Sequence, residues 1–251
     1  MRKLALIIPC YDEARRFDPE AFAALAGLTD ATLLFVNDGS RDATEARLRA
    51  FCGRSGARAE LLSFSRNRGK GESVREGLRA ALHAGAEVVG YLDADLATPP
   101  EEVLRLASAL SAEGPSVVLG SRVRVLGSQI ERSALRHYGG RIFATLAALI
   151  LRVPVYDTQC GAKLFRRTRA LEAALAEPFL SRWCFDVELL GRLLIGAPDA
   201  PGLPLPALRE LPLRSWRDVP GGKVGLRQAP RVAFELGRVA LDLSRRRRAI
   251  G

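Results

Sequence analysis

The sequence predicts a doubly wound α/β fold, in which helices cover both faces of a mostly parallel sheet. Short apolar runs alternate with amphipathic segments through the first half of the 251-residue chain. Most of these runs are apolar at nearly every position, as expected for strands that are buried on both faces. A hydrophobic fraction of 48% and a charged fraction of 26% are typical of a globular chain that is long enough to bury a core.

The predicted elements of the first half follow one another in regular order. Five apolar runs are expected to be strands: Leu4–Ile8, Thr32–Val36, Ala59–Phe64, Val88–Leu92 and Ser116–Gly120. The helical patterns between them are Pro19–Leu28, Asp42–Arg54, Gly71–Ala84 and Pro99–Ala112. Thr98 is placed to cap the last of these helices, and Glu101 is placed to complete a capping box.

The second half is less regular. Helices are expected at Ser133–Leu151, at Asp186–Ile195 and from about Gln228 to the arginines that end at Arg248. Strands are expected at Ala162–Arg167 and Leu208–Trp216, with a proline-stiffened extended connection between residues 196 and 207. Residues 1–220 are therefore predicted to form one domain, and residues 221–251 a basic, amphipathic helical tail.

Composition limits the possible functions. The net charge of +10 and the isoelectric point near 10.2 predict an anionic partner: nucleic acid, a phosphorylated substrate or an acidic membrane. The four cysteines are scattered and no secretory signal precedes the first strand, which predicts reduced thiols and a cytoplasmic protein. The longest apolar run, Ile142–Leu151, is about half of the roughly 20 residues that a transmembrane helix needs, so none is expected.

Polar segments follow the first four predicted strands. We call these segments, Pro9–Glu13, Asn37–Ser40, Ser65–Gly71 and Asp93–Asp95, the rim, because ligands of doubly wound sheets bind beyond the carboxyl ends of the strands. Asp93 and Asp95 project to the same side of an extended chain, and their repulsion favours a cation. Mg²⁺ or Mn²⁺ prefers such oxygen ligands. Neither a G-x-G-x-x-G motif nor a Walker A loop is present, so oxidoreductases and P-loop ATPases are excluded.

Four segments resemble, in order and spacing, the glycosyltransferase family 2 pattern on a GT-A fold: LIIPCYDEARRF, FVNDGSRDAT, RNRGKGESVREGL and YLDADLATPPEE. LGSRV, YDTQCGAKLFRR and FDVELLGRL are similar to the dolichyl-phosphate glucose and mannose synthases, with the glucosyl type closer. The resemblance implies an inverting, metal-dependent transfer of glucose, or else mannose, from a UDP-glucose or GDP-mannose type donor to a polyprenyl phosphate. The alternatives are a family member that acts on a hydroxyl acceptor and a nucleotide-sugar binding protein without turnover.

The resemblance also implies roles for individual residues. The side chains expected to bind the nucleotide sugar are Pro9, Tyr11, Glu13, Asp38, Lys70 and Asp93, and the metal ligands are Asp93 and Asp95. The catalytic candidates are Asp95, Asp157 and Glu188. Asp157 would orient the acceptor or the sugar, or else be a buried structural carboxylate, and Glu188 would be the base for a hydroxyl acceptor. Ala97 stands where mannosyl synthases often have Gln, so a third side-chain ligand is missing and water is expected to replace it.

A lipid phosphate is already anionic at neutral pH, so it needs cations for positioning rather than a general base. The basic residues expected to bind this phosphate are Arg122, Arg132, Lys163 and Lys223. For each of them a solvated position on an arginine-rich surface is the alternative.

Two segments suggest peripheral contact with the cytosolic face of a membrane. The run Ile142–Leu151 is either an interfacial helix or a core helix. The tail has an apolar stripe beside many arginines, which would attract it to anionic lipid; the stripe consists of Val232, Leu236, Val239 and Leu243. Nucleic acid is not expected as a partner, because the arginine run has no interleaved aromatic residues.

Overall fold

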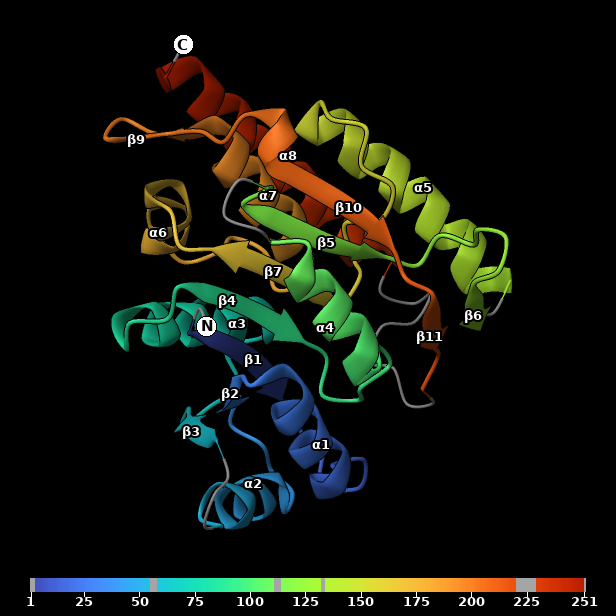
Figure 1. The fold of residues 1–251 in the computed structure, drawn as a ribbon. Coiled ribbons are helices and arrows are strands. Elements are labelled where there is room, and N and C mark those ends of the chain that lie inside the picture. Colours follow the sequence, from blue (N-terminus) through green and yellow to red (C-terminus); the bar gives the residue numbers. More distant parts are fainter. Residues whose placement is uncertain (1–2, 55–57, 111–113, 132–133, 220–228, 251) are drawn as a thin grey trace.

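The computed structural model describes residues 3–54, 58–110, 114–131, 134–219 and 229–250. Over these residues a seven-stranded sheet with the order β10-β5-β7-β4-β1-β2-β3 lies between two layers of helices (Figure 1). Its strands are β1 (Leu4–Cys10), β2 (Thr32–Asn37), β3 (Ala59–Ser63), β4 (Val88–Leu92), β5 (Val117–Ser121), β7 (Ala162–Arg166) and β10 (Leu208–Pro212). All pair in parallel except β7, which runs antiparallel to both β4 and β5.

The helices are α1 (Pro19–Thr29), α2 (Thr44–Cys52), α3 (Lys70–His83), α4 (Pro100–Ser108), α5 (Ala134–Leu151), α6 (Arg169–Ala176), α7 (Phe185–Ile195) and α8 (Ala229–Ile250). Outside the main sheet, β6 (Gln129–Glu131) pairs with β11 (Ser215–Arg217), and β8 (Gly196–Ala197) pairs with β9 (Ala200–Pro201). A single 3₁₀ turn at Leu205–Ala207 precedes β10.

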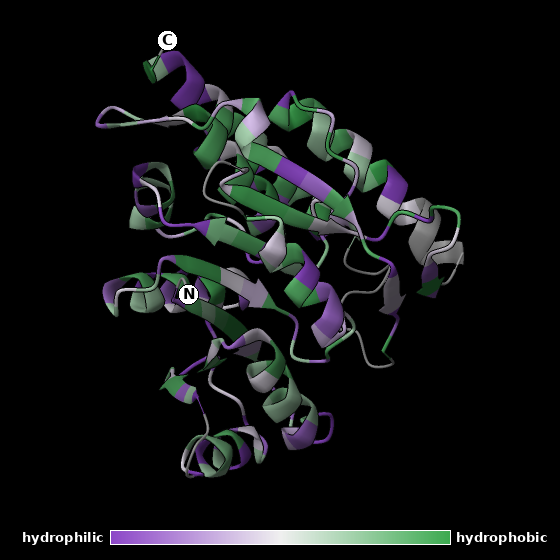
Figure 2. Cartoon of the chain, viewed as in Figure 1, coloured by the Kyte–Doolittle hydropathy of each residue, from purple (hydrophilic) through white to green (hydrophobic). Residues whose placement is uncertain are grey.

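Strand β4 shows why the central runs are apolar at every position. Val89 and Tyr91 point into one helical layer, whereas Val88 and Leu92 point into the other, so both faces of the strand are buried. Figure 2 shows the same hydrophobic character along the neighbouring central strands. The alternation also determines where the next residues lie, because Asp93 continues the side of Val89 and Tyr91.

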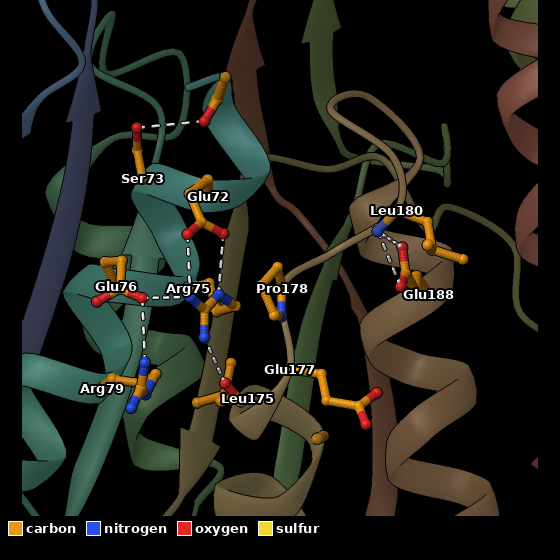
Figure 3. A network of polar contacts seen from close by, with 12 residues as sticks. Glu72, Ser73, Arg75, Glu76, Arg79, Leu175, Glu177, Pro178, Leu180 and Glu188 are labelled. Atoms are coloured by element: carbon orange, nitrogen blue, oxygen red, sulfur yellow. Dashed lines mark hydrogen bonds and ion pairs between the residues drawn. The ribbon is translucent and has the colours of Figure 1, made fainter. Parts of the chain in front are cut away.

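The two layers differ in composition. Helices α1, α2 and α4 cover one face, and four aromatic rings from this side pack with centroids 5.0 to 5.7 Å apart: Phe17, Phe22, Phe35 and Phe51. Residues of α3, α5, α6, α7 and α8 cover the other face. Arg75 of α3 is buried in this second layer, where it donates to Glu72 and to the Leu175 carbonyl oxygen of α6, each at 2.9 Å (Figure 3).

The prediction of a doubly wound, mostly parallel sheet is confirmed, and each of the five predicted N-terminal strands is present. Strand β3 is only partly buried rather than buried on both faces, because it is the edge strand of the sheet. The segment predicted as one strand, 208–216, is divided between β10 and β11 of two different sheets.

The predicted cap of α4 is wrong. The residue that precedes this helix is Pro99, and no side chain caps the helix. Pro100 follows Pro99 and disfavours helical backbone angles for it, and Pro99 is accordingly extended, with φ −70° and ψ 158°. The helix therefore begins at Pro100, and Thr98 lies one residue too far upstream to cap it.

Helix α8 packs against the rest of the fold through the apolar stripe of the predicted tail. Leu236, Val239 and Leu243 are buried in the same core layer as α7. The Ser181 hydroxyl also donates to Glu235 of α8 over 2.6 Å. This stripe is therefore not available to a membrane. No helix in the described ranges has both the length and the apolar character needed to cross a bilayer.

Candidate active site

Hydrogen bonds connect the loops that follow the first three strands. The Asp38 N–H donates to the Cys10 carbonyl oxygen over 2.8 Å, which ties the loop after β2 to the end of β1. The Asp38 carboxylate accepts from the N–H groups of Arg68 (2.6 Å) and Gly69 (2.9 Å) in the loop after β3. Three segments of the rim are thus held as one framework.

Gly39 permits this framework. It has a φ of +64°, and a Cβ atom at this position would lie 2.4 Å from the backbone carbonyl carbon of Arg66. Asp38 is 3% exposed, and burial raises the pKa of its carboxyl, although the two N–H donors oppose this. The carboxylate therefore holds the loop before α3, while Pro9 and Tyr11 at the end of β1 remain partly accessible.

Asp93 and Asp95 follow β4 at the rim, as predicted. Asp93 Oδ1 lies 2.5 Å from Lys70 Nζ, and Asp95 Oδ2 lies 4.0 Å from Arg16 Nη1. Burial alone would raise the pKa of Asp93, but the Lys70 ammonium, together with the charges of Arg122 and Lys163, lowers this pKa. The pKa of Asp95 is raised, first by burial and then by the neighbouring Asp93 charge.

These two carboxylates fit a divalent metal. They are hard oxygen donors close enough to repel each other, and a cation would relieve that repulsion. Within the described ranges, no group of three or more Asp, Glu, His or Cys residues could hold a metal, so the remaining ligands would come from water and a substrate phosphate. Ala97 has a buried methyl group, and its N–H donates to Asp95 Oδ1 over 3.1 Å.

Gly161, which was not predicted as a site residue, supports Asp93 from the position directly before β7. The Asp93 N–H donates to the Gly161 carbonyl oxygen over 3.2 Å. A Cβ atom at position 161 would lie 2.1 Å from Asp93 Oδ2, so only glycine leaves room for this carboxylate. The sequence feature that could have indicated this role is the glycine of CGAK, which stands directly before an apolar strand.

Arg122 and Asp157 form a buried ion pair beside the candidate metal ligands. Arg122 donates to the Asp157 carboxylate from Nε (2.7 Å), Nη2 (2.9 Å) and the backbone N–H (3.0 Å). Burial would raise the pKa of Asp157, yet Arg122 holds it far below its ordinary value. Asp157 is consequently a poor proton acceptor. The hydrogen bonds described for the Arg122 guanidinium use Nε and Nη2, so Nη1 can donate to another anion.

Lys163 was predicted to bind the acceptor phosphate at the rim, but its side chain points into the core instead. Its side chain is fully buried, and its ammonium donates to the Cys160 carbonyl oxygen and to Asp186, each at 2.6 Å. The Tyr91 hydroxyl donates to the same carboxylate, and burial raises the pKa of this tyrosine well above its ordinary value. Lys163 therefore balances Asp186 inside the fold and is not available to an acceptor phosphate.

Glu188 is also placed differently from the prediction. It is fully buried on α7, where it accepts from the Leu180 N–H at 2.9 Å (Figure 3). It also accepts from Arg192 at 2.6 Å. This carboxylate holds the segment before α7 and is paired inside the fold rather than facing an acceptor. Arg132 and Lys223, two predicted phosphate-binding residues, lie outside the residues that the structure describes.

A small cavity of about 70 Å³ lies next to the Arg122–Asp157 pair. Arg141, Tyr156 and Thr158 contribute to its lining, and the Arg141 guanidinium carbon lies 3.8 Å from the centre of the Tyr156 ring. The buried Thr158 hydroxyl has no hydrogen-bond partner among the described residues. Arg141 was not predicted as a site residue, since in the sequence it only flanks the apolar run.

A family model described as "Glycosyl transferase family 2" matches residues 5–171. Dolichyl-phosphate beta-glucosyltransferase of Drosophila melanogaster is 33% identical, with 88% of this chain and 69% of that protein covered. The protein of the same name from Saccharomyces cerevisiae is 30% identical, with 89% and 69% covered.

Solved structures of glucosyl-3-phosphoglycerate synthase from Mycobacterium tuberculosis are similar in fold. The complex with phosphoglyceric acid superposes with a TM-score of 0.66 at 21% identity and covers 98% of this chain and 80% of that one. The complex with Mn²⁺, UDP-glucose and phosphoglyceric acid has a TM-score of 0.64 at 19% identity, with 96% and 79% covered.

Proposed function

The chain belongs to glycosyl transferase family 2, has the GT-A fold and is a glycosyltransferase, and we propose that it transfers glucose, with inversion, from UDP-glucose to a polyprenyl phosphate of the dolichyl phosphate type. The names of the fly and yeast relatives support the acceptor, and they favour glucose over mannose. Because the chain is an enzyme, a nucleotide-sugar binding protein without turnover is no longer an alternative.

The observation that most supports a phosphate acceptor is the state of the candidate bases. Asp157 is paired with Arg122, and Glu188 is paired with Arg192 inside the fold. A hydroxyl acceptor would need a free base near the rim, whereas a phosphate acceptor needs only cations that position it. The ion pairing of both carboxylates therefore favours the phosphate.

The rim residues and Arg122 would bind different parts of the two substrates. Asp93 and Asp95 would hold Mg²⁺ or Mn²⁺ on the donor diphosphate, where the ion stabilises the charge of the leaving group. Lys70 is the first residue of α3, so its ammonium and the N-terminus of the helix together favour the same diphosphate. Arg122, oriented by Asp157, would hold the acceptor phosphate through Nη1. Pro9, Tyr11, Glu13 and Asp38 line or support the remaining part of the nucleotide site.

The proposed reaction is tested by combining UDP-glucose or GDP-mannose with a polyprenyl phosphate or the matching free polyprenol. Each combination is assayed with Mn²⁺ and with chelator. We expect product with UDP-glucose and the phosphate only, and none with chelator. Product on the free alcohol alone would contradict the phosphate acceptor, and product from GDP-mannose alone would contradict glucose transfer.

We also propose that α5 makes peripheral contact with an anionic membrane, at its cytosolic face, where a lipid acceptor resides. Ala144, Ala147 and Leu151 bury one side of this helix in the core, so the core-helix alternative holds for that side. On the opposite side Ile142, at 67% exposure, and Leu149, at 70% exposure, face solvent. Large exposed apolar side chains beside a strongly basic fold suit the surface of an acidic bilayer.

Replacing both Ile142 and Leu149 by serine is expected to weaken binding to vesicles that contain phosphatidylserine by about tenfold or more, because each side chain would otherwise leave water. Sedimentation with the vesicles measures the effect. Leu28→Ser removes an exposed leucine from α1, on the other face of the sheet, and should leave binding unchanged. Equal binding of the double variant and the unchanged protein would contradict the contact.

A further inference from the structure

Two side-chain cations already lie beside the candidate metal ligands. Lys70 Nζ is 2.5 Å from Asp93 Oδ1, whereas Arg16 Nη1 is 4.0 Å from Asp95 Oδ2. The Arg16 guanidinium is bonded mainly to Glu13, over 2.7 and 2.8 Å. The bond described for the Lys70 ammonium is the one to Asp93. Lys70 is therefore the stronger competitor of a metal for this site.

We propose that Lys70 is an internal counter-cation that a divalent metal must displace from Asp93, and that the nucleotide diphosphate assists this displacement by accepting the released ammonium. This inference rests on the proposed function, which supplies the diphosphate. Lys70 thereby couples the binding of metal to the binding of nucleotide.

The position of Lys70 allows such an exchange. Its side chain is 31% exposed and extends from the first residue of α3, so it can turn without any change in the helix. The ammonium also lies 5.9 Å from the centre of the Phe185 ring, which gives the side chain a second contact within its reach. Once displaced, the ammonium remains near the helix N-terminus, where an anionic diphosphate is favoured.

The exchange has a thermodynamic consequence. A metal alone must break the Lys70–Asp93 ion pair and leaves the ammonium without a new anionic partner. A metal that binds together with a diphosphate gives Lys70 a new partner. By linkage, the diphosphate then raises the affinity for the metal, and the metal raises the affinity for the diphosphate by the same factor.

Binding of Mn²⁺ without nucleotide tests this exchange, followed by the loss of the electron paramagnetic resonance signal of free Mn²⁺. We expect Lys70→Met to bind Mn²⁺ about fivefold more tightly than the unchanged protein, the factor that corresponds to one partly exposed ion pair. Addition of UDP should then increase the Mn²⁺ affinity of this variant less than that of the unchanged protein.

Lys3→Met is the matched control. It removes one positive charge from an exposed position before β1, so it reports the general effect of charge on cation binding. Lys70→Gln provides the same comparison if the methionine variant does not fold. Equal or weaker Mn²⁺ binding by the Lys70 variants than by Lys3→Met would overturn the inference.

The readout is independent of glucosyl transfer. Tighter Mn²⁺ binding by Lys70→Met supports the exchange even if the transfer assay yields no product with polyprenyl phosphate. Introducing Asp93→Asn into Lys70→Met should remove the gain in affinity. If the gain remained, the metal would bind elsewhere and the inference would be wrong.

Discussion

Asp93→Asn combined with Asp95→Asn is expected to lower turnover on the order of 1000-fold, because a metal supplies several kcal/mol of charge stabilisation and each factor of ten corresponds to about 1.4 kcal/mol. Both amides keep the size of the side chains they replace and remove only the negative charge. The donor diphosphate would then leave without a cation held by the protein.

Initial rates at saturating Mn²⁺, together with thermal unfolding, measure this effect. The double variant loses the repulsion that raises the pKa of Asp95 together with the partly exposed Lys70–Asp93 ion pair, so the melting temperature should change little while the rate falls. Asp199→Asn changes an exposed carboxylate in the turn between β8 and β9 and should retain full activity. An unchanged rate in the double variant would exclude a metal at this pair.

Arg122→Leu is expected to lower the free energy of unfolding by about 3–5 kcal/mol, because the Asp157 charge remains buried without its partner. The exposed fractions of the two side chains are 15% and 9%, so water can do little to stabilise the remaining carboxylate. Arg49→Leu breaks a 2.6 Å ion pair in which the arginine is 70% exposed. That control should change stability by less than about 1 kcal/mol. Urea unfolding at pH 7 measures both values, and equal losses would contradict the special role of the buried pair.

The same pair predicts a dependence on pH. The pKa of Asp157 is lowered in the folded state, whereas in the unfolded chain it has the ordinary value of 3.8. Its contribution to stability is therefore complete above that value and is lost as the pH falls toward the folded-state pKa. The stability difference between the unchanged protein and Asp157→Asn should be about 1 kcal/mol smaller at pH 3 than at pH 7. A difference independent of pH would show that the carboxylate charge is not responsible.

Periodicity predicted the doubly wound sheet well because buried central strands must be apolar on both faces, and β4 is the clearest example. The order of the strands in the sheet was harder to predict from the sequence. The Ala162–Arg167 run is recognisable as a strand, but nothing in it indicates insertion between β4 and β5 in the antiparallel direction. The buried stripe of α8 also shows that an amphipathic pattern indicates which side of a helix is apolar, but not which surface covers that side.

The candidate site was likewise predictable only in part. Asp93, Asp95, Lys70 and Asp38 were placed together correctly, since each follows a parallel strand that ends at one edge of the sheet. Lys163 and Glu188 were placed incorrectly. The charge of Lys163 is balanced by Asp186 on another element, and that of Glu188 by Arg192 on the next turn of the same helix. The type of a residue and its neighbours in the sequence do not reveal such pairing. For these two residues, a partner inside the fold takes the place of a ligand.

The insertion of β7 also constrains how the chain can fold during synthesis. Within the described part of the chain, strand β5 pairs with β7 and β10 alone, and their residues follow about 45 and 90 positions later. A nascent chain that ends soon after residue 125 could pair β1 to β4, but its β5 would have no strand beside it and Asp93 would lack its Gly161 support. The candidate metal ligands are thus made early, but they gain the support of Gly161 only after the chain has been synthesised as far as β7, so this site cannot take its final form in the order in which the sequence is read.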